Sequence, residues 1–174
     1  MKITFDTNCL INFFDTQSGT ATSSEEIAQL LRYATNGQLS IVISTRTEAD
    51  LDQDRDQARR DRIKRNLDMF DVIGSVLRWD EAKWNGGDVY ADGEPGALAD
   101  EIQKILFPNL RRDDRHFGNK IRDVDHLVAH ALDKRDIFVT DDGRLNRRAE
   151  ELAKFGIVVM RPGECLAYID SRAA

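Results

Sequence analysis

The sequence predicts an α/β protein, a three-layer α/β/α sandwich with a central parallel sheet of four to five strands. Short apolar runs rich in β-branched residues alternate with longer helix-like stretches along the chain. These runs are continuously apolar, which is typical of parallel strands buried on both faces. With 174 residues, of which 41% are hydrophobic, the chain is long and apolar enough to form one core. We therefore expect a single domain over residues 1–174, with right-handed crossover helices on both faces of the sheet.

Four apolar runs are predicted to form the central strands, and a fifth run is a weaker candidate. Each is short, as strands are, and each is bounded by polar or turn-forming residues. The four are Ile3–Phe5, Leu39–Ser44, Asp136–Thr140 and Gly156–Met160, and the weaker candidate is Ser75–Trp79.

Helices are predicted between these strands from the signals at their ends. Ser23 and Glu26 form a capping-box pattern for a helix that ends near Asn36 and Gly37. Another helix is expected to start directly after Asp6. The remaining predicted helices are a long charged one over Arg46–Val72, then Pro95–Leu106, Arg122–Lys134, Gly143–Phe155 and a short one within Pro162–Ile169, while Asp80–Gly96 is predicted to be an exposed loop.

The composition narrows the class of protein. No apolar run approaches the ~20 residues that span a bilayer. Asp6 and Asp15 interrupt the apolar stretch at the N-terminus, unlike a signal peptide, so the cytoplasm is the expected location. Cys9 and Cys165 lie far apart and lack the spacing of a zinc pair. We expect both to be free thiols, with Cys9 in the core.

Acidic residues are predicted to gather at one edge of the sheet. The carboxyl ends of parallel strands meet at one edge, and ligands of open α/β sheets bind there. Four segments bring acids to this edge: the ends of the first and fourth strands, the turn after the second strand, and the start of the helix before the fourth strand. These acids are Asp6, Glu48, Asp123, Asp125, Asp141 and Asp142.

Each of these acids alone is also explained as a helix-terminal residue favoured by backbone amides and the helix dipole. Helix capping does not require all of them to share one edge, however, so their convergence favours a site. Carboxylates packed together raise one another's pKa unless a cation lies among them. Because Mg²⁺ and Mn²⁺ prefer carboxylate and water ligands, the sequence predicts a site for one of these ions. Such a site can activate water and clamp a phosphodiester.

Four motifs, in order along almost the whole chain, resemble the PIN-domain ribonuclease family, whose members include the VapC-like toxins of bacterial toxin–antitoxin pairs. An apolar strand is followed by Asp-Thr-Asn in FDTNCLINFF, and a glutamate follows the second strand in STRTEADL. An aspartate opens an alanine-containing helix in DVDHLVAHAL, and Thr-x-Asp follows the fourth strand in FVTDDGRL. The chain is longer than the compact toxins, so the resemblance is to a toxin or to a stand-alone PIN-like nuclease.

The resemblance implies a metal-dependent endoribonuclease. Its catalytic and metal-binding acids would be Asp6, Glu48, Asp125 and Asp142, with Asp141 and Asp123 as second-ranked metal ligands. Thr7, Asn8 and Thr140 would support the site through hydrogen bonds. The implied partners are an RNA substrate and, for a toxin, a small antitoxin protein, and a homodimer is a further expectation.

Basic residues are grouped along the chain although its net charge is −6. Each group alone is equally compatible with a solvated helix face or polar loop. Next to a nuclease pocket, the same groups are expected to bind the RNA backbone, because affinity for phosphate is mainly electrostatic. The residues predicted to bind RNA are Arg111, Arg112, Arg115, Lys120, Arg122 and Arg144.

Three other interpretations are less consistent with the sequence. His126 and His130 have the spacing of a zinc-binding pair, but no third ligand is evident nearby, so they are predicted to be ordinary helix residues. A haloacid dehalogenase-type phosphatase needs a second acid where this chain has Asn8. The remaining alternative is a catalytically idle PIN-like module that binds RNA or protein.

Overall fold

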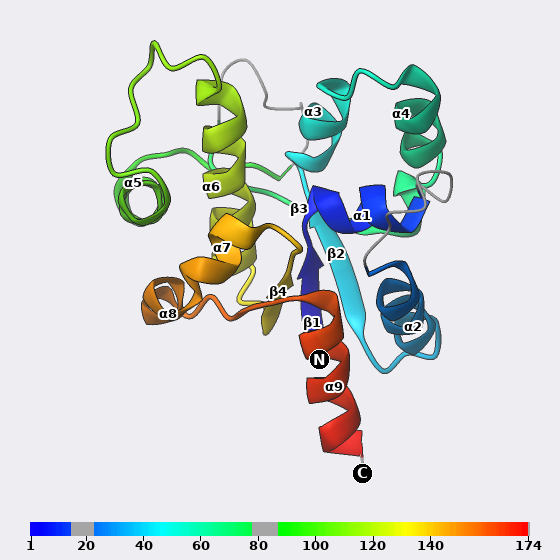
Figure 1. Cartoon of the computed structure of the whole chain (residues 1–174). Coiled ribbons are helices and arrows are strands. Elements are labelled where there is room, and N and C mark those ends of the chain that lie inside the picture. Colours follow the sequence, from blue (N-terminus) through cyan, green and yellow to red (C-terminus); the bar gives the residue numbers. More distant parts are fainter. Residues whose placement is uncertain (15–22, 78–86, 174) are drawn as a thin grey trace.

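A five-stranded parallel sheet runs through the centre of the protein (Figure 1). The structure, a computed structural model, describes residues 1–14, 23–77 and 87–173. The strand order is β3-β2-β1-β4-β5. The strands are β1 (Lys2–Phe5), β2 (Ser40–Ser44), β3 (Asp71–Ile73), β4 (Ile137–Val139) and β5 (Val159–Met160).

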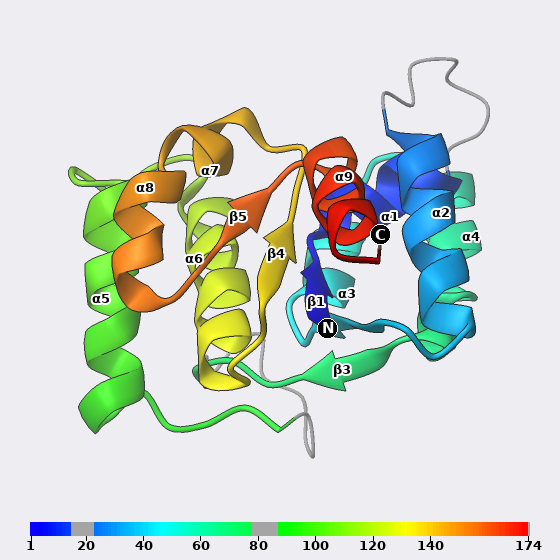
Figure 2. The same cartoon turned by 90° about the horizontal axis from the view of Figure 1, so that it is seen from below.

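Helices cover both faces of the sheet and give the three predicted layers (Figures 1 and 2). On one face the side chains of Ile3 and Phe5 pack into a core with α1, α2, α4 and α9. On the other face Phe138 packs into a second core with α5, α6 and α8. The helices are α1 (Thr7–Phe14), α2 (Ser24–Thr35), α3 (Thr47–Asp52), α4 (Gln57–Lys64), α5 (Gly93–Leu106), α6 (Phe117–Leu132), α7 (Gly143–Arg147), α8 (Ala149–Leu152) and α9 (Pro162–Ala173).

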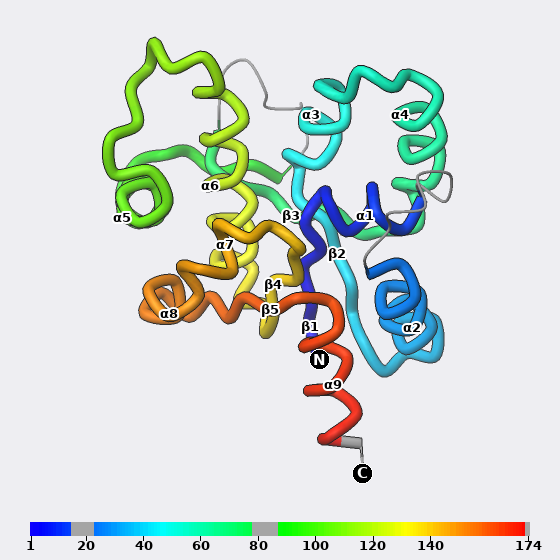
Figure 3. Tube along the Cα trace, in the orientation of Figure 1, coloured from blue at the N-terminus to red at the C-terminus, as the bar shows by residue number. Residues whose placement is uncertain are grey.

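The strand order creates a switch point between β1 and β4. From β1 the sheet continues through β2 to β3, whereas from β4 it continues to β5 on the other side. Phe5 and Val139 are paired at the carboxyl ends of these two central strands. The connections leave β1, β2 and β4 at the same end of the sheet (Figure 3). A crevice at such a switch point is where open α/β sheets bind their ligands.

The fifth strand is the main correction to the predicted sheet. It is formed by Asp71–Ile73, not by the described part of Ser75–Trp79, of which residues 78 and 79 lie outside the described residues. The reason is that the backbone after β3 is held by other partners. The guanidinium of Arg46 donates to the carbonyl of Val76, and Ser75 N donates to a carboxylate oxygen of Asp88 at 2.8 Å. Residues 80–86 of the predicted loop also lie outside the described part.

The helix predicted over Arg46–Val72 is divided, which is a second correction. It forms α3, α4, a short 3₁₀ helix at Leu67–Met69, and β3. Aspartates between α3 and α4 offer the backbone other partners, since Asp54 accepts from Asp56 N and Asp56 accepts from Arg59 N, each at 3.0 Å. Asp56 therefore caps the start of α4 and separates it from α3.

Smaller differences concern the extent and capping of individual helices. The segment Gly143–Phe155 forms α7, α8 and a 3₁₀ turn instead of one helix, and α6 begins earlier than predicted, at Phe117. Ser23 does not cap α2 with its side chain, because its hydroxyl donates to Asp141. Both cysteines are buried and free, as predicted. None of the described helices is long and apolar enough to cross a membrane.

Candidate functional site

Asp6 lies at the switch point, between the end of β1 and the start of α1. Its side chain is buried and accepts hydrogen bonds on both oxygens. Oδ1 accepts from Thr7 N at 2.7 Å, and Oδ2 accepts from Asn8 Nδ2 at 2.7 Å and from Thr140 Oγ1 at 2.6 Å. Burial raises the pKa of Asp6 above its ordinary value, although the charge of His126 opposes this. Asn8 and Thr140 thus orient Asp6, as the sequence predicted.

Asp142 and Asp141 follow β4 on the other side of the switch point. Asp142 Oδ1 accepts from Arg144 N at 2.5 Å and Leu145 N at 3.3 Å, so this acid caps α7. Asp141 is turned toward α1 and α2, where it accepts from Asn12 Nδ2 at 2.7 Å and Ser23 Oγ at 3.0 Å. Of this pair, Asp142 faces the other acids closely enough to influence Asp123, whereas Asp141 holds two helices in place.

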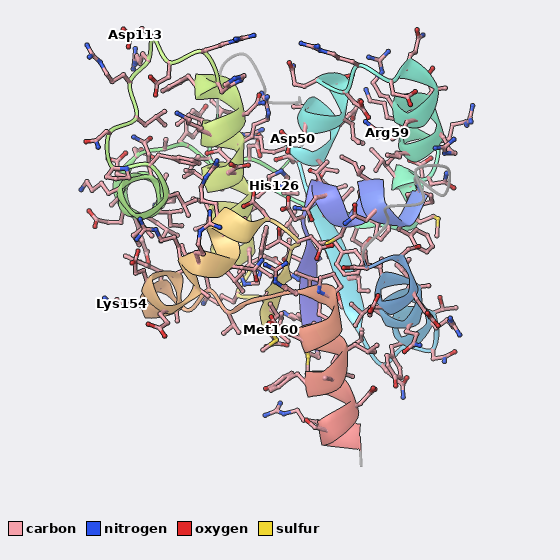
Figure 4. All side chains as sticks on the ribbon, in the orientation of Figure 1. Asp50, Arg59, Asp113, His126, Lys154 and Met160 are labelled. Carbon is pink, nitrogen blue, oxygen red and sulfur yellow. The ribbon has the colours of Figure 1, made fainter. Side chains whose placement is uncertain are left out.

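Asp50, on α3, is an acid of the site that the sequence analysis missed. Its Oδ1 accepts from Arg122 Nε at 2.6 Å, and its Oδ2 lies 2.7 Å from His126 Nε2 and 3.1 Å from Thr7 Oγ1. Figure 4 shows Asp50 and His126 approaching each other between α3 and α6. The other ring nitrogen of His126 lies 2.7 Å from Ser44 Oγ, which fixes the orientation of the imidazole. His126, predicted to be an ordinary helix residue, thus lies in contact with Asp50 and Ser44 beside the acids.

The charges of Asp50 and His126 stabilise each other. Burial alone would raise the pKa of Asp50, but His126 and Arg122 outweigh burial and hold it below its ordinary value. Burial alone would lower the pKa of His126, but the hydrogen bond and charge of Asp50 outweigh it and raise this pKa to about 8. At neutral pH the pair is thus a carboxylate beside an imidazolium, with a second cation from Arg122.

Asp123, in the second turn of α6, is an acid with a strongly shifted pKa. Burial raises its pKa to about 7, and the negative charges of Asp6, Asp50 and Asp142 add to that shift, while His126 opposes it. Its cationic partner Arg144 lies 3.4 Å away, and both side chains of this pair are partly exposed. Four segments of the chain thus place Asp6, Asp50, Asp123 and Asp142 within electrostatic reach of one another.

Glu48 and Asp125, which the sequence motifs assign to the site, contact basic residues in the structure. Glu48 lies 3.5 Å from Lys64 on α4, with 38% of its side chain exposed. Asp125 is fully buried, and its Oδ2 accepts from Arg46 Nε at 3.2 Å. The difference has one geometric cause: the acids that face Asp6 are two residues away in each helix, and helix positions i and i+2 point to different faces.

The basic residues predicted to bind RNA fall into three groups. Arg122 is buried and paired with Asp50, which removes it from the surface. Lys120 and Arg144 lie over the ring of Phe107, with Lys120 Nζ at 5.9 Å and Arg144 Cζ at 4.9 Å from its centroid. The third group, Arg111, Arg112 and Arg115, is exposed in the loop between α5 and α6.

The chemistry of the donors fits a hard divalent cation. Asp6, Asp123 and Asp142 offer carboxylate oxygens, which Mg²⁺ and Mn²⁺ prefer. Burial raises the pKa of Asp123, and the negative charges of Asp6 and Asp142 add to that shift, so a cation among these acids would be electrostatically favoured. As their side chains stand, no three His, Cys, Asp or Glu residues of the described part are grouped closely enough to hold a metal ion.

Comparisons with known proteins identify the fold. No family model matches the sequence, and a search of curated protein sequences found no match. Among solved structures, the chain is similar to one chain of the crystal structure of VapBC2 from Rickettsia felis bound to a DNA fragment from their promoter. The two are 10% identical, the TM-score is 0.52, and the match covers 92% of this chain and 98% of the other. At this identity the similarity concerns the fold alone, and it agrees with the predicted parallel α/β/α arrangement.

Proposed function

We propose that the protein is a metal-dependent endoribonuclease of the PIN type, with Asp6, Asp50, Asp123 and Asp142 as the acids of its active site. Asp50 and Asp123 take the places that the sequence motifs gave to Glu48 and Asp125. The observation that carries the proposal is the convergence of these acids from four separate segments, close enough for the charges of Asp6, Asp50 and Asp142 to add to the raised pKa of Asp123. Strongly shifted acids in a crevice at a switch point are typical of catalytic sites.

The four acids would have different roles. Asp6, Asp123 and Asp142 would hold Mg²⁺ or Mn²⁺, since none of them has the two close cationic partners that Asp50 has. When bound, such an ion supplies activation of a water nucleophile and stabilises charge on the attacked phosphate. Asp50 would act as a positioning residue that keeps the charged groups of Arg122 and His126 beside the other acids. Asn8 and Thr140 fix the orientation of Asp6.

The experiment that tests the proposal compares wild type with Asp6→Asn on single-stranded RNA in the presence of Mn²⁺. We expect wild type to cleave and the variant to lose at least about 10²-fold in rate, a loss comparable to removing one preorganised electrostatic group. Asn can still accept from Thr7 N, so the fold should persist, as circular dichroism would show. Asp113→Asn is the control, because Asp113 lies in the exposed loop, 78% exposed and away from the acids (Figure 4).

The alternative is an idle PIN-like module that binds RNA or protein without cleavage. RNA binding by purified wild type without any Mn²⁺-dependent cleavage would favour that alternative over the nuclease. The intact and mutually perturbed acids are the reason for preferring the enzyme.

A toxin role with a small antitoxin partner is a narrower proposal. It is supported by the fold shared with a chain of the VapBC2 complex and by the sequence motifs. Strong induction of the chain should arrest growth, and co-expression of a small neighbouring open reading frame should relieve the arrest. Normal growth with confirmed soluble protein would contradict the toxin role while leaving the nuclease proposal intact.

A further inference from the structure

Two cations from different elements meet over one aromatic ring at the border of the acids. Lys120 comes from α6 and Arg144 from α7, and both lie over Phe107, the residue that follows α5. The Arg144 guanidinium is the nearer one, with its Cζ 4.9 Å from the ring centroid. A guanidinium held over an aromatic face is attracted by the ring while its N–H edge stays available to an anion. Phe107 therefore holds two cations, of which Arg144 lies beside Asp123.

Arg144 is only weakly held by its carboxylate neighbour. The distance of 3.4 Å from its Nη1 to Asp123 Oδ2 is longer than the 2.7–2.9 Å of a strong charge-assisted hydrogen bond. The side chain of Arg144 is 44% exposed and that of Asp123 is 30% exposed, so solvent screens their attraction. An incoming phosphate can therefore take hydrogen bonds from Arg144 without the loss of a strong buried ion pair.

The ring beneath the cations is not itself a stacking surface for a nucleobase. Only 8% of Phe107 is exposed, so its face is covered by Lys120 and Arg144 and by the core that includes Leu106. The loop between α5 and α6 adds three exposed arginines, Arg111, Arg112 and Arg115, of which Arg111 pairs with Asp113 at 3.5 Å. The arrangement suits the sugar-phosphate backbone of a strand, with its evenly spaced anionic groups.

We infer that Phe107, Lys120 and Arg144 form a phosphate subsite, in which Arg144 binds the phosphodiester beside the acids and positions the nucleic-acid strand for attack. The inference rests on the proposed nuclease function and deepens it, since it assigns the residues that bind the nucleic-acid strand next to the scissile phosphodiester bond. Phe107 has no place in the sequence motifs, and Arg144 is separated from the other predicted RNA-binding residues along the chain. Arg144 is a positioning residue here because it holds the strand and takes no part in the chemistry.

The test measures binding without cleavage. A short fluorescein-labelled single-stranded RNA, and DNA of the same sequence, are titrated with protein in EDTA at several salt concentrations, and anisotropy gives Kd. We expect Arg144→Gln to raise Kd about tenfold, the loss of one hydrogen-bonded charge contact. The slope of log K against log salt should become shallower by about 0.7, the value for one phosphate contact on a single strand.

Matched variants separate this contact from a general change of charge. Arg148→Gln removes the same charge from a side chain of nearly equal exposure, 43%, which pairs with Glu151 instead. It should leave Kd within about twofold, as expected for a cation outside the binding track. Phe107→Leu keeps both charges and removes the ring, so it should weaken binding while the salt slope is unchanged. Lys120→Gln should weaken binding less than Arg144→Gln, because Lys120 also pairs with Asp114 at 3.2 Å.

Equal weakening on RNA and DNA supports a phosphate contact, whereas weakening on RNA alone indicates a ribose contact and overturns the subsite. An Arg144→Gln variant that binds like Arg148→Gln also overturns it, and if wild type still cleaves RNA with Mn²⁺, the nuclease proposal stands without it. Wild type that neither binds nucleic acid in EDTA nor cleaves RNA with Mn²⁺ would overturn both.

Discussion

The imidazole of His126 and the carboxylate of Asp50 lie 2.7 Å apart, although the residues are 76 positions apart in the sequence. This contact joins α6 to α3 at the carboxyl edge of the sheet. It leaves Asp50 with a lowered pKa, whereas burial and neighbouring acids raise the pKa of Asp123 to about 7. Two carboxylates whose pKa values move in opposite directions are suited to different tasks. Asp50 is a fixed anion, and Asp123 changes charge near neutral pH.

The pKa of His126 can be measured directly and depends on Asp50. In an NMR pH titration of the ring C–H signals, we expect His126 to titrate near pH 8 and His130, buried against Thr4, to titrate near pH 4. Asp50→Asn removes the hydrogen bond and charge that contribute most to raising the pKa of His126 but leaves its burial, so His126 should then titrate clearly below pH 8.

The same shift affects stability in a defined pH window. Because the folded-state pKa of His126 is above 6.5, its protonation contributes stability below pH 6.5 that is lost as pH rises through about 8. A shift of this size corresponds to about 2 kcal/mol. Urea unfolding should therefore show a stability difference between wild type and Asp50→Asn that is larger at pH 6 than at pH 9. A difference independent of pH would contradict the charged pair.

Glu48 and Asp50 are alternative candidates for the α3 acid of the proposed active site, and cleavage assays can distinguish between them. Glu48→Gln should leave kcat/KM for RNA within about twofold and stability within about 0.5 kcal/mol, since its partly exposed contact with Lys64 is weak. Asp50→Asn should lower kcat/KM at least tenfold, because Arg122 and His126 then lose their common partner. The opposite result, with Glu48→Gln inactive and Asp50→Asn active, would restore the motif-based assignment.

Asp125 is expected to contribute to the stability of the fold and not to catalysis. It is fully buried against Arg46, whose guanidinium also pairs with Asp88 at 3.0 Å. Asp125→Ala should lower the free energy of unfolding by about 3 kcal/mol, because a buried arginine loses one of its anions. Asp113→Ala, at an exposed position, is the control and should change it by less than about 0.5 kcal/mol. A stable Asp125→Ala variant that fails to cleave RNA would instead indicate a role in catalysis.

Much of the fold could be predicted from the sequence because its signals are local. Four continuously apolar runs gave the positions of β1, β2, β4 and β5, and their alternation with helices gave the parallel sheet. The fifth strand was missed because Asp71–Ile73 is a short edge strand with an exposed Val72, which carries little apolar signal. The backbone after this strand is held by contacts between residues far apart in the sequence: Arg46 pairs with Asp88 and donates to the carbonyl of Val76.

The site was predicted less completely, and the reason is helical register. Asp6 and its partners Asn8 and Thr140 follow directly after strands, where the backbone direction is fixed, and their contacts were anticipated. On α3 and α6 several acids lie within one turn, and a sequence motif does not show which of them faces the sheet edge. In the structure Asp50 and Asp123 are the acids of these helices that interact electrostatically with His126, and we propose them as site residues for that reason.

Ionised Asp123 should destabilise the folded protein at neutral pH, and measuring this effect tests directly whether Asp123 belongs to the site. Its folded-state pKa of about 7 lies above the ordinary 3.8, so the folded protein holds a proton that the unfolded chain releases. Stability is therefore lost as pH rises from about 4 to 7 and stays low above that range. Asp123→Asn carries no charge, so its melting temperature should exceed that of wild type at pH 8, with a smaller excess at pH 5.

Metal binding should reverse this difference. Mn²⁺ compensates the charge of Asp123, so it should raise the melting temperature of wild type at pH 8 in proportion to its binding. In Asp123→Asn the same ion should have little effect, and RNA cleavage should fall although the protein is more stable. That combination is expected of a residue retained for function at the expense of stability. If Mn²⁺ raises both melting temperatures equally, or if Asp123→Asn melts lower than wild type at pH 8, Asp123 is not the uncompensated acid of a metal site.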